Sequence, residues 1–330
     1  MSAQRLRRTV SLLALALAPS ATGCEAGSSG GASEPQEYGS SAVANAPASA
    51  FAPTRDPAQL AAFDEQARAD LAADVLRRTE AARHTYGDDV PLRVESGLFV
   101  LIGAERGVDF TGAADLAQRT LDVYLGSIFA RRPDRAVSVY IVKSAAKFID
   151  LCDERFTSGC EGDLGAYSRK TRDIIVNIGP GLPTITHEMA HPLLQSDFPR
   201  IPSWFEEGIA SLFEKPVFTP PGEIHGAKNW RNDRLAAALS SPARRRVLHV
   251  PAFFSLADED LDHADQDALY AGLRTFCQWL DERGQLWPLY RAWRAGAAED
   301  PTGGQSFSRV TGMTLEQADA AWLGWVKGMR

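Results

Sequence analysis

The pattern of hydrophobic and polar positions divides the 330-residue chain into an early part that contains strands and a later part that is mostly helical. Short runs of apolar and β-branched residues predict strands over residues 98–102, 136–142 and 173–178. Apolar residues at helical spacing predict helices over residues 57–83, 112–130, 145–151, 183–196, 203–214, 265–282 and 314–327. This order predicts an α+β fold with one mixed sheet in the N-terminal part and a mostly helical C-terminal part.

The first 55 residues do not share this pattern and predict an export signal followed by a linker. Residues 1–23 join a basic stretch to the apolar run from Val10 to Ala18, which is too short to span a membrane but is typical of a signal peptide. Small residues directly before Cys24 resemble the bacterial lipobox, which implies that Cys24 is lipidated and holds the chain at a membrane surface. Residues 24–55 are rich in Ala, Ser, Gly and Pro and predict a flexible tether, which leaves residues 56–330 as the folded domain.

These features predict an exported protein of the cell envelope that is lipid-anchored to a membrane. The alternative is an ordinary signal peptide cleaved near Ala21, which would leave a soluble periplasmic or secreted protein. The cysteines agree with export, because Cys152 and Cys160 flank a short polar loop and could pair in an oxidising compartment, which would stabilise the fold by roughly 2–3 kcal/mol. Cys277 lies in an apolar helical pattern and is predicted to be a buried thiol.

The overall composition excludes two classes of protein. Hydrophobic residues make up 45% and charged residues 23% of the chain, as in soluble globular proteins, and this excludes a polytopic membrane protein. The formal net charge is −7, whereas binding to phosphates needs clustered Lys and Arg. We therefore expect no nucleic-acid partner.

A metal-binding pattern lies in the helix predicted over residues 183–196. His187, Glu188 and His191 form an H-E-x-x-H run. Residues four apart share one face of a helix, so both imidazoles can reach a single ion. The Glu188 carboxylate lies one residue further round the helix, from where it can approach a water molecule on the metal without binding the metal itself.

Zinc hydrolases use three protein ligands and leave one position open. The helix predicted to start near Ser203 carries two acids in its first turn, Glu206 and Glu207. One of them could face back toward His187 and His191. Both could also be ordinary first-turn acids, which favour the helix dipole.

The run HEMAH, followed by PSWFEEGIA at residues 202–210, resembles the gluzincin metallopeptidases of the peptidase MA-like families, which carry H-E-x-x-H and then W-x-x-E-G-x-A. The resemblance extends more loosely over residues 95–327. It implies a zincin-like fold with an active-site helix and one Zn²⁺ ion held by His187, His191 and Glu207. It also implies that Glu188 is the general base through which a metal-activated water hydrolyses peptide bonds.

The chain departs from this family pattern at particular positions. Pro192 directly follows the second histidine and should kink or end the helix there. Ser211 stands where the family often has an acid, so the partner that orients a ligating histidine is unassigned, and Asp197 or Glu206 could serve. Asp197 also has the spacing of the third ligand in metzincins, but Leu194 replaces the Gly of that motif, which favours the gluzincin arrangement.

Two further expectations concern the substrate. Tyr270 is the candidate donor to the oxyanion, because related enzymes often place a Tyr or His in a downstream helix, although its helical spacing also fits a core position. Weaker candidates for this donor are His225, His249 and His263. A peptide could add as a strand to a sheet edge near Ile174 to Ile178.

The sequence thus predicts an exported zinc-dependent peptidase that acts on a peptide or protein substrate. The alternative is a catalytically silent zinc-binding module that interacts with cell-envelope proteins. A third hypothesis, in which the histidines are structural and bind no metal, is tested directly by metal analysis.

Overall fold

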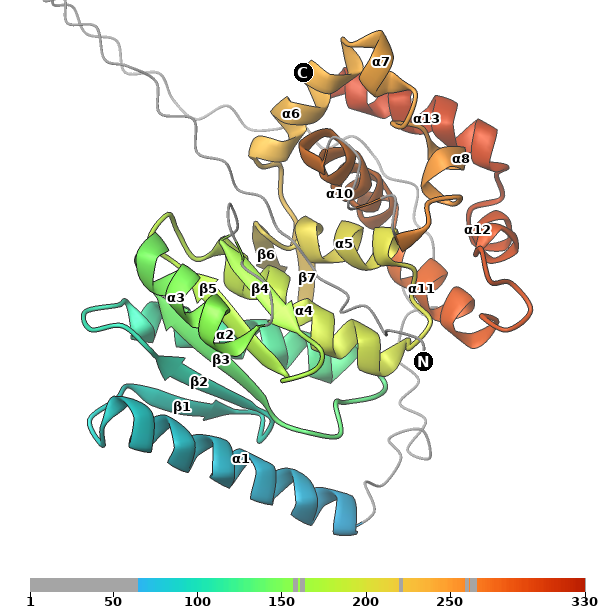
Figure 1. Ribbon diagram of the computed structural model, residues 1–330. Coiled ribbons are helices and arrows are strands. Elements are labelled where there is room, and N and C mark those ends of the chain that lie inside the picture. Colours follow the sequence, from blue (N-terminus) through green and yellow to red (C-terminus); the bar gives the residue numbers. More distant parts are fainter. Residues whose placement is uncertain are drawn as a thin grey trace, which may run out of the picture.

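The structure is a computed structural model that describes residues 65–156, 160, 164–219, 222–258, 261 and 266–329. It is an α+β fold with a mixed five-stranded sheet, as predicted (Figure 1). The strands are β1 (Leu92–Glu95), β2 (Phe99–Gly103), β3 (Val137–Val142), β4 (Gly165–Ser168) and β5 (Asp173–Asn177). Their order is β1-β2-β3-β5-β4, in which β2, β3 and β5 are parallel and the outer strands β1 and β4 run antiparallel to their neighbours.

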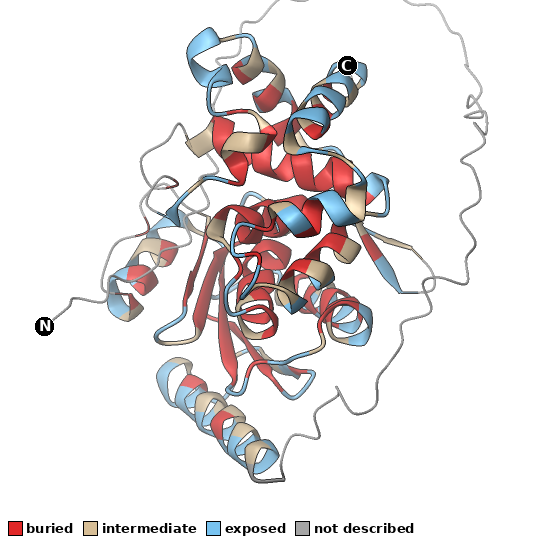
Figure 2. Cartoon of the chain, turned by 90° about the vertical axis from the view of Figure 1, so that its right-hand side faces the viewer, coloured by how far each residue is buried: buried red, intermediate tan, exposed pale blue. Residues whose placement is uncertain are grey.

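Helices cover both faces of this sheet: α1 (Glu65–Tyr86), α2 (Phe110–Val123), the π-helix η2 (Tyr124–Ile128), α3 (Ala145–Arg155) and α4 (Pro183–Asp197). Successive side chains of a strand point to opposite faces, so the strands contribute to two cores. Leu101 and Val139 pack on the side of α2, η2 and α4. Val100 and Tyr140 pack on the side of α1 and α3. Figure 2 shows the buried residues that run along the strands between these layers.

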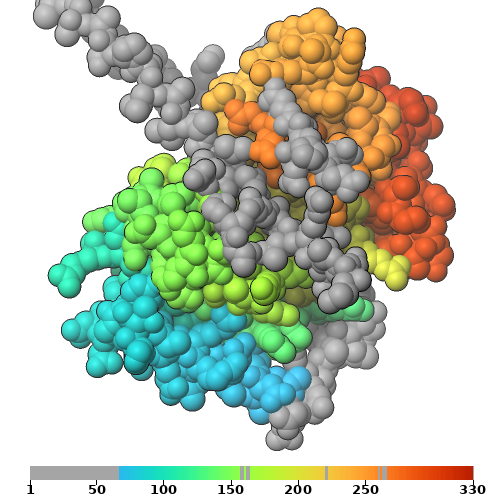
Figure 3. Space-filling view, in the orientation of Figure 1, coloured from blue at the N-terminus to red at the C-terminus, as the bar shows by residue number. Residues whose placement is uncertain are grey.

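The C-terminal part is mostly helical, as predicted. It contains α5 (Ser203–Leu212), the hairpin of β6 (Pro216–Thr219) and β7 (Glu223–Gly226), α6 (Trp230–Leu239), α7 (Pro242–Arg245), α8 (Val250–Phe253), α10 (Gln266–Glu282), α11 (Leu286–Ala295), α12 (Gly304–Thr311) and α13 (Leu315–Gly328). Helix α10 is central to this part and packs against α5, α6, α11 and α13. In Figure 3 the residues of α6 to α13, in orange and red, form the upper and right-hand part of the molecule.

Gly208 lies where α5 passes α10. A Cβ atom at this position would lie 2.7 Å from Sγ of Cys277 and 3.1 Å from the carbonyl oxygen of Leu273. Both distances are shorter than an ordinary van der Waals contact. The glycine that follows Glu207 therefore lets α5 approach α10 closely.

Each helix and strand predicted from the sequence has a counterpart in the structure. The helix expected over residues 112–130 divides into α2 and η2, and the helix expected over residues 203–214 ends at Leu212. The sequence predicted that Pro192 would kink or end its helix, and the second alternative is wrong, because α4 continues through Pro192 to Asp197. The buried side chains of Leu193 and Leu194 pack into the core there, and this packing outweighs the loss of one backbone donor. The sequence pattern did not predict strands β1, β4, β6 and β7, because a strand of four residues is too short to show a clear periodicity.

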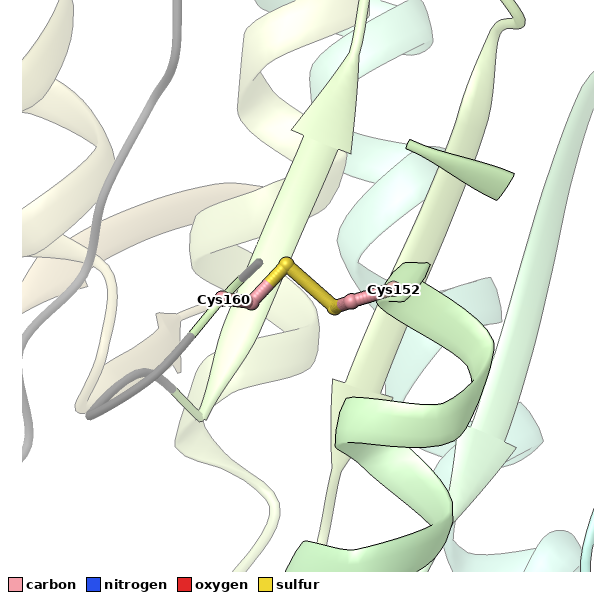
Figure 4. Close-up of a disulfide and its surroundings, with 2 residues drawn as sticks. All are labelled: Cys152 and Cys160. Atoms are coloured by element: carbon pink, nitrogen blue, oxygen red, sulfur yellow. A yellow bond between two sulfur atoms is a disulfide. The ribbon is translucent and has the colours of Figure 1, made fainter. Parts of the chain in front are cut away.

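Cys152 and Cys160 form a disulfide, with their Cα atoms 6.0 Å apart (Figure 4). The bond joins the last turns of α3 to the segment that leads into β4. Cys277 is a buried free thiol, as predicted.

The predicted signal peptide (1–23), the lipidated Cys24 and the tether (24–55) lie outside the described residues, and so does His263. Over the part of the chain that the structure describes, no helix combines the length and apolar character that a membrane span requires.

Candidate metal centre

Helices α4 and α5 bring His187, His191 and Glu207 together in a buried group. One ligand atom from each residue lies within 4.8 Å of the other two. Nε2 of His187 is 3.5 Å from Oε2 of Glu207, and Nε2 of His191 is 4.0 Å from Oε1 of Glu207. Tetrahedral zinc sites with bonds of about 2.0–2.1 Å place neighbouring ligand atoms about 3.4 Å apart. The group could therefore hold a divalent metal ion.

The atoms around this group include buried polar atoms without partners. Within the described residues, neither Nε2 of His191 nor either carboxylate oxygen of Glu188 makes a hydrogen bond. Buried polar atoms in folded proteins nearly always have a partner, and leaving one without costs about 1–3 kcal/mol. A cation and the water that it binds would satisfy these atoms, so the donor set fits a metal ion.

The junction of α4 with α5 is fixed by local contacts. The hydroxyl of Thr186 donates to the carbonyl of Phe213, just beyond α5, at 2.5 Å. Trp204 and Phe205 anchor the first turn of α5 in the core, where both rings lie against Trp293. Glu206 and Glu207 follow directly and therefore have defined directions relative to the two histidines.

The side chain of His191 is held on two sides. Its Nδ1 atom lies 2.8 Å from Oε1 of Glu206, which also accepts a hydrogen bond from Gln195 at 2.7 Å. The ring of Tyr167, from strand β4, stacks on the imidazole with 6.4 Å between centroids and 4° between planes. Of the two partners proposed from the sequence, Glu206 therefore contacts the histidine. A carboxylate on Nδ1 leaves Nε2 as the nitrogen that can bind a metal.

His187 has a corresponding partner that the sequence analysis missed. Its Nδ1 atom lies 3.5 Å from Oε1 of Glu214. Glu214 in turn accepts hydrogen bonds from Nε of Arg231 at 2.9 Å and from Nη2 at 2.7 Å, and both side chains are buried. A helix continued to residue 214 would place Glu214 two turns after Glu207 on the same face, and this spacing is the signal in the sequence that points to it.

Burial and neighbouring charges shift the pKa values of this group. Burial disfavours a charged His187, but the adjacent carboxylates of Glu207 and Glu214, each 3.5 Å from a ring nitrogen, outweigh it and raise the pKa of His187 to about 10. Burial raises the pKa of Glu188 to about 7, against the opposing effect of His187 and His191. Burial alone would raise the pKa of Glu214, but Arg231 and His187 hold it well below its usual range. A carboxyl with a pKa near 7 is suited to accept and release a proton at neutral pH.

Asp197 does not belong to the metal group. Its Oδ1 atom accepts hydrogen bonds from the backbone N–H groups of Ala130 and Arg131, at 3.0 Å and 2.8 Å. Its Oδ2 atom accepts from the Tyr290 hydroxyl at 2.9 Å and from Arg294. Asp197 thus joins the end of α4 to the segment that follows η2 and to α11. The metzincin arrangement, with Asp197 as a ligand, is therefore not supported.

Tyr270 is buried in α10, and its ring centroid lies 5.6 Å from the guanidinium of Arg231. Tyr270 is therefore near the Arg231 that pairs with Glu214, and its role as oxyanion donor stays a prediction. Two of the alternative histidines have other contacts. His225 lies 3.3 Å from Asp281, and Nδ1 of His249 accepts a hydrogen bond at the start of α8.

The sheet edge beside the site is strand β4, not the segment near Ile174 to Ile178. Those residues belong mostly to β5, which pairs with β3 on one side and with β4 on the other. The expectation of an edge at β5 is therefore wrong, because the short strand β4 covers it. The edges of the five-stranded sheet are β1 and β4.

Comparison of the sequence with models of known protein families finds no match, and comparison with curated proteins finds no similar sequence.

Proposed function

We propose that the chain is a zinc-dependent peptidase with a zincin-like fold and a gluzincin ligand set of His187, His191 and Glu207. The observation that carries the proposal is the place of Glu188. Its buried carboxylate lies 4.0 Å from Nε2 of His187 and makes no hydrogen bond to any described residue. A purely structural role would not leave a buried carboxylate in this state, whereas a general base must keep an oxygen available for a proton.

Each of these residues has a distinct role in the proposed reaction. A bound Zn²⁺ ion supplies a Lewis acid that polarises the substrate carbonyl and makes a water molecule acidic near neutral pH. The Glu188 carboxylate takes the proton of the attacking water and delivers it to the leaving amine. Glu206 and Glu214 orient the two imidazoles through their Nδ1 atoms. Tyr270 is the proposed donor to the oxyanion, and β4 is the proposed docking edge for an extended peptide.

The test uses the purified full chain, with metal analysis and a peptide library. We expect about one Zn²⁺ per chain and peptide cleavage that a chelator abolishes. The Glu188→Gln variant should keep the metal and lose about 10²–10⁴-fold in kcat, because it removes only the base. Glu223→Gln is the matched control, since Glu223 is an exposed glutamate on β7 whose loss should change neither property. Equal activity of Glu188→Gln and the native chain would refute the base assignment.

Two other results would replace the peptidase proposal. A chain that binds zinc but cleaves no peptide would be a catalytically silent zinc-binding module, whose cell-envelope partners would then be sought. A chain that binds no metal would make the two histidines structural.

The proposed location is the cell envelope, with the chain exported and lipid-anchored through Cys24. The disulfide between Cys152 and Cys160 supports it, because disulfides persist in oxidising compartments. Labelling with a fatty-acid analogue tests the anchor: the native chain should carry label in the membrane fraction, and Cys24→Ser should be unlabelled. If both chains are soluble and unlabelled, the protein is a periplasmic or secreted one.

A further inference from the structure

Strand β4 passes directly over the carboxylate of Glu188. A Cβ atom at Gly165 would lie 2.6 Å from Oε1 and 2.7 Å from Cγ of Glu188, and closer still to the Cγ2 atom of Thr184. These distances are too short for any side chain without movement of its neighbours. Gly165 is buried and lies in the first position of β4.

The backbone does not explain this glycine. Its φ lies outside the left-handed region, whereas Gly181, before α4, has a φ of 144°. Gly165 pairs with Val176 in regular antiparallel register. Glycine within a strand weakens it, because the strand loses a side chain that could pack and the unfolded chain gains freedom. The reason for glycine here is therefore the space above Thr184 and Glu188.

That space is occupied by a carboxylate to which none of the described residues donates a hydrogen bond. Both oxygens of Glu188 are buried and lack hydrogen-bond partners among the described residues. A larger residue at position 165 would push this carboxylate away from β4 and change its position relative to His187. The position of the proposed general base thus depends on the lack of a side chain at residue 165.

We propose that Gly165 is a positioning residue. Because it has no side chain, the Glu188 carboxylate can lie against β4 in the position from which it can exchange a proton. This inference rests on the proposed function of Glu188. In this role Gly165 acts through Glu188 and is not itself a catalytic residue.

The first test measures the steric relationship without using activity. The contact with Thr184 is removed by Thr184→Ser, which deletes the Cγ2 atom. In this background, Gly165→Ala is introduced into two chains, one that keeps Glu188 and one that carries Glu188→Ala. The unfolding of each variant is measured in denaturant. We expect Gly165→Ala to raise the unfolding equilibrium constant about fivefold or more with Glu188 present, and much less with Ala at 188. Gly126→Ala is the control, because a Cβ at Gly126 meets nothing within 4 Å.

The second test measures the reaction. In the Thr184→Ser background, Gly165→Ala should lower kcat about tenfold or more while zinc content stays at one ion per chain and KM changes little. An equal effect of Gly165→Ala on unfolding with and without Glu188 would overturn the inference, and so would an unchanged kcat in an active enzyme. The effect of Gly165→Ala on unfolding could depend on Glu188 while the native chain cleaves no peptide. This result would support the placement of Glu188 by Gly165 and refute the proposed peptidase activity.

Discussion

Nδ1 of His187 lies 3.5 Å from Oε1 of Glu214, a residue just beyond the end of α5. The carboxylate is fixed in turn by Arg231, so the first proposed metal ligand faces a buried ion pair that we propose orients it. The second, His191, is oriented by Glu206. The two imidazoles therefore depend on different carboxylates, and each dependence can be tested alone.

Glu214→Gln should weaken zinc binding about 10–100-fold, because it removes the negative charge that orients and polarises His187. Competition with a chromogenic chelator measures the affinity. Glu223→Gln, the exposed control, should leave the affinity unchanged. An affinity of Glu214→Gln within twofold of the native chain would contradict this role.

Metal binding should release protons at neutral pH. The pKa of His187 is raised to about 10, so the cation must displace a proton from a ring that is protonated at pH 7. Because the proton competes with the cation, the apparent affinity for the metal should rise with pH up to about pH 10. For each proton released, this affinity should fall about tenfold when the pH is lowered by one unit.

Titration calorimetry at pH 7 in two buffers of different ionisation enthalpy measures this release. The native chain should give different binding enthalpies in the two buffers. Glu214→Gln should release fewer protons, because it removes one of the groups that raise the pKa of His187. Identical enthalpies in both buffers and a flat affinity from pH 5 to about 7 would show that no imidazole loses a proton.

The ring of Tyr167 should contribute to zinc binding through its stack on His191. Tyr167→Leu should lower the zinc affinity by about 3–10-fold, since an aromatic pair contributes about 0.5–1.5 kcal/mol beyond its buried area. Tyr167→Phe keeps the ring and should stay within about twofold of the native affinity. The absorption spectrum of the Co²⁺-substituted chain provides a second measurement, which should change in the Leu variant only. A Phe variant as weak as the Leu variant would assign the effect to the hydroxyl instead.

Removal of the disulfide should destabilise the fold. Cys152→Ser with Cys160→Ser should lower the free energy of unfolding by roughly 2–3 kcal/mol, because the unfolded chain regains the freedom of the closed loop. Denaturant unfolding with and without reductant measures it. The reductant should lower the stability of the native chain to that of the double variant and leave the double variant unchanged. If the reductant does not change the stability of the native chain, the chain does not contain this bond.

The sequence by itself determined the features that local patterns encode. Helical periodicity placed His187, Glu188 and His191 on one helix and Glu206 and Glu207 on the next, and β-branched runs located β2, β3 and β5. These predictions succeeded because helix and strand spacing depend on neighbours within a few residues.

Only the tertiary structure decided which distant residues surround this group. It placed Glu214 and Arg231 at His187, Tyr167 at His191, and Asp197 in a separate network. It also put β4 rather than β5 at the sheet edge, with Gly165 over Glu188. These contacts join elements through strand order and helix packing, and a pattern with a period of two or four residues carries no information about them.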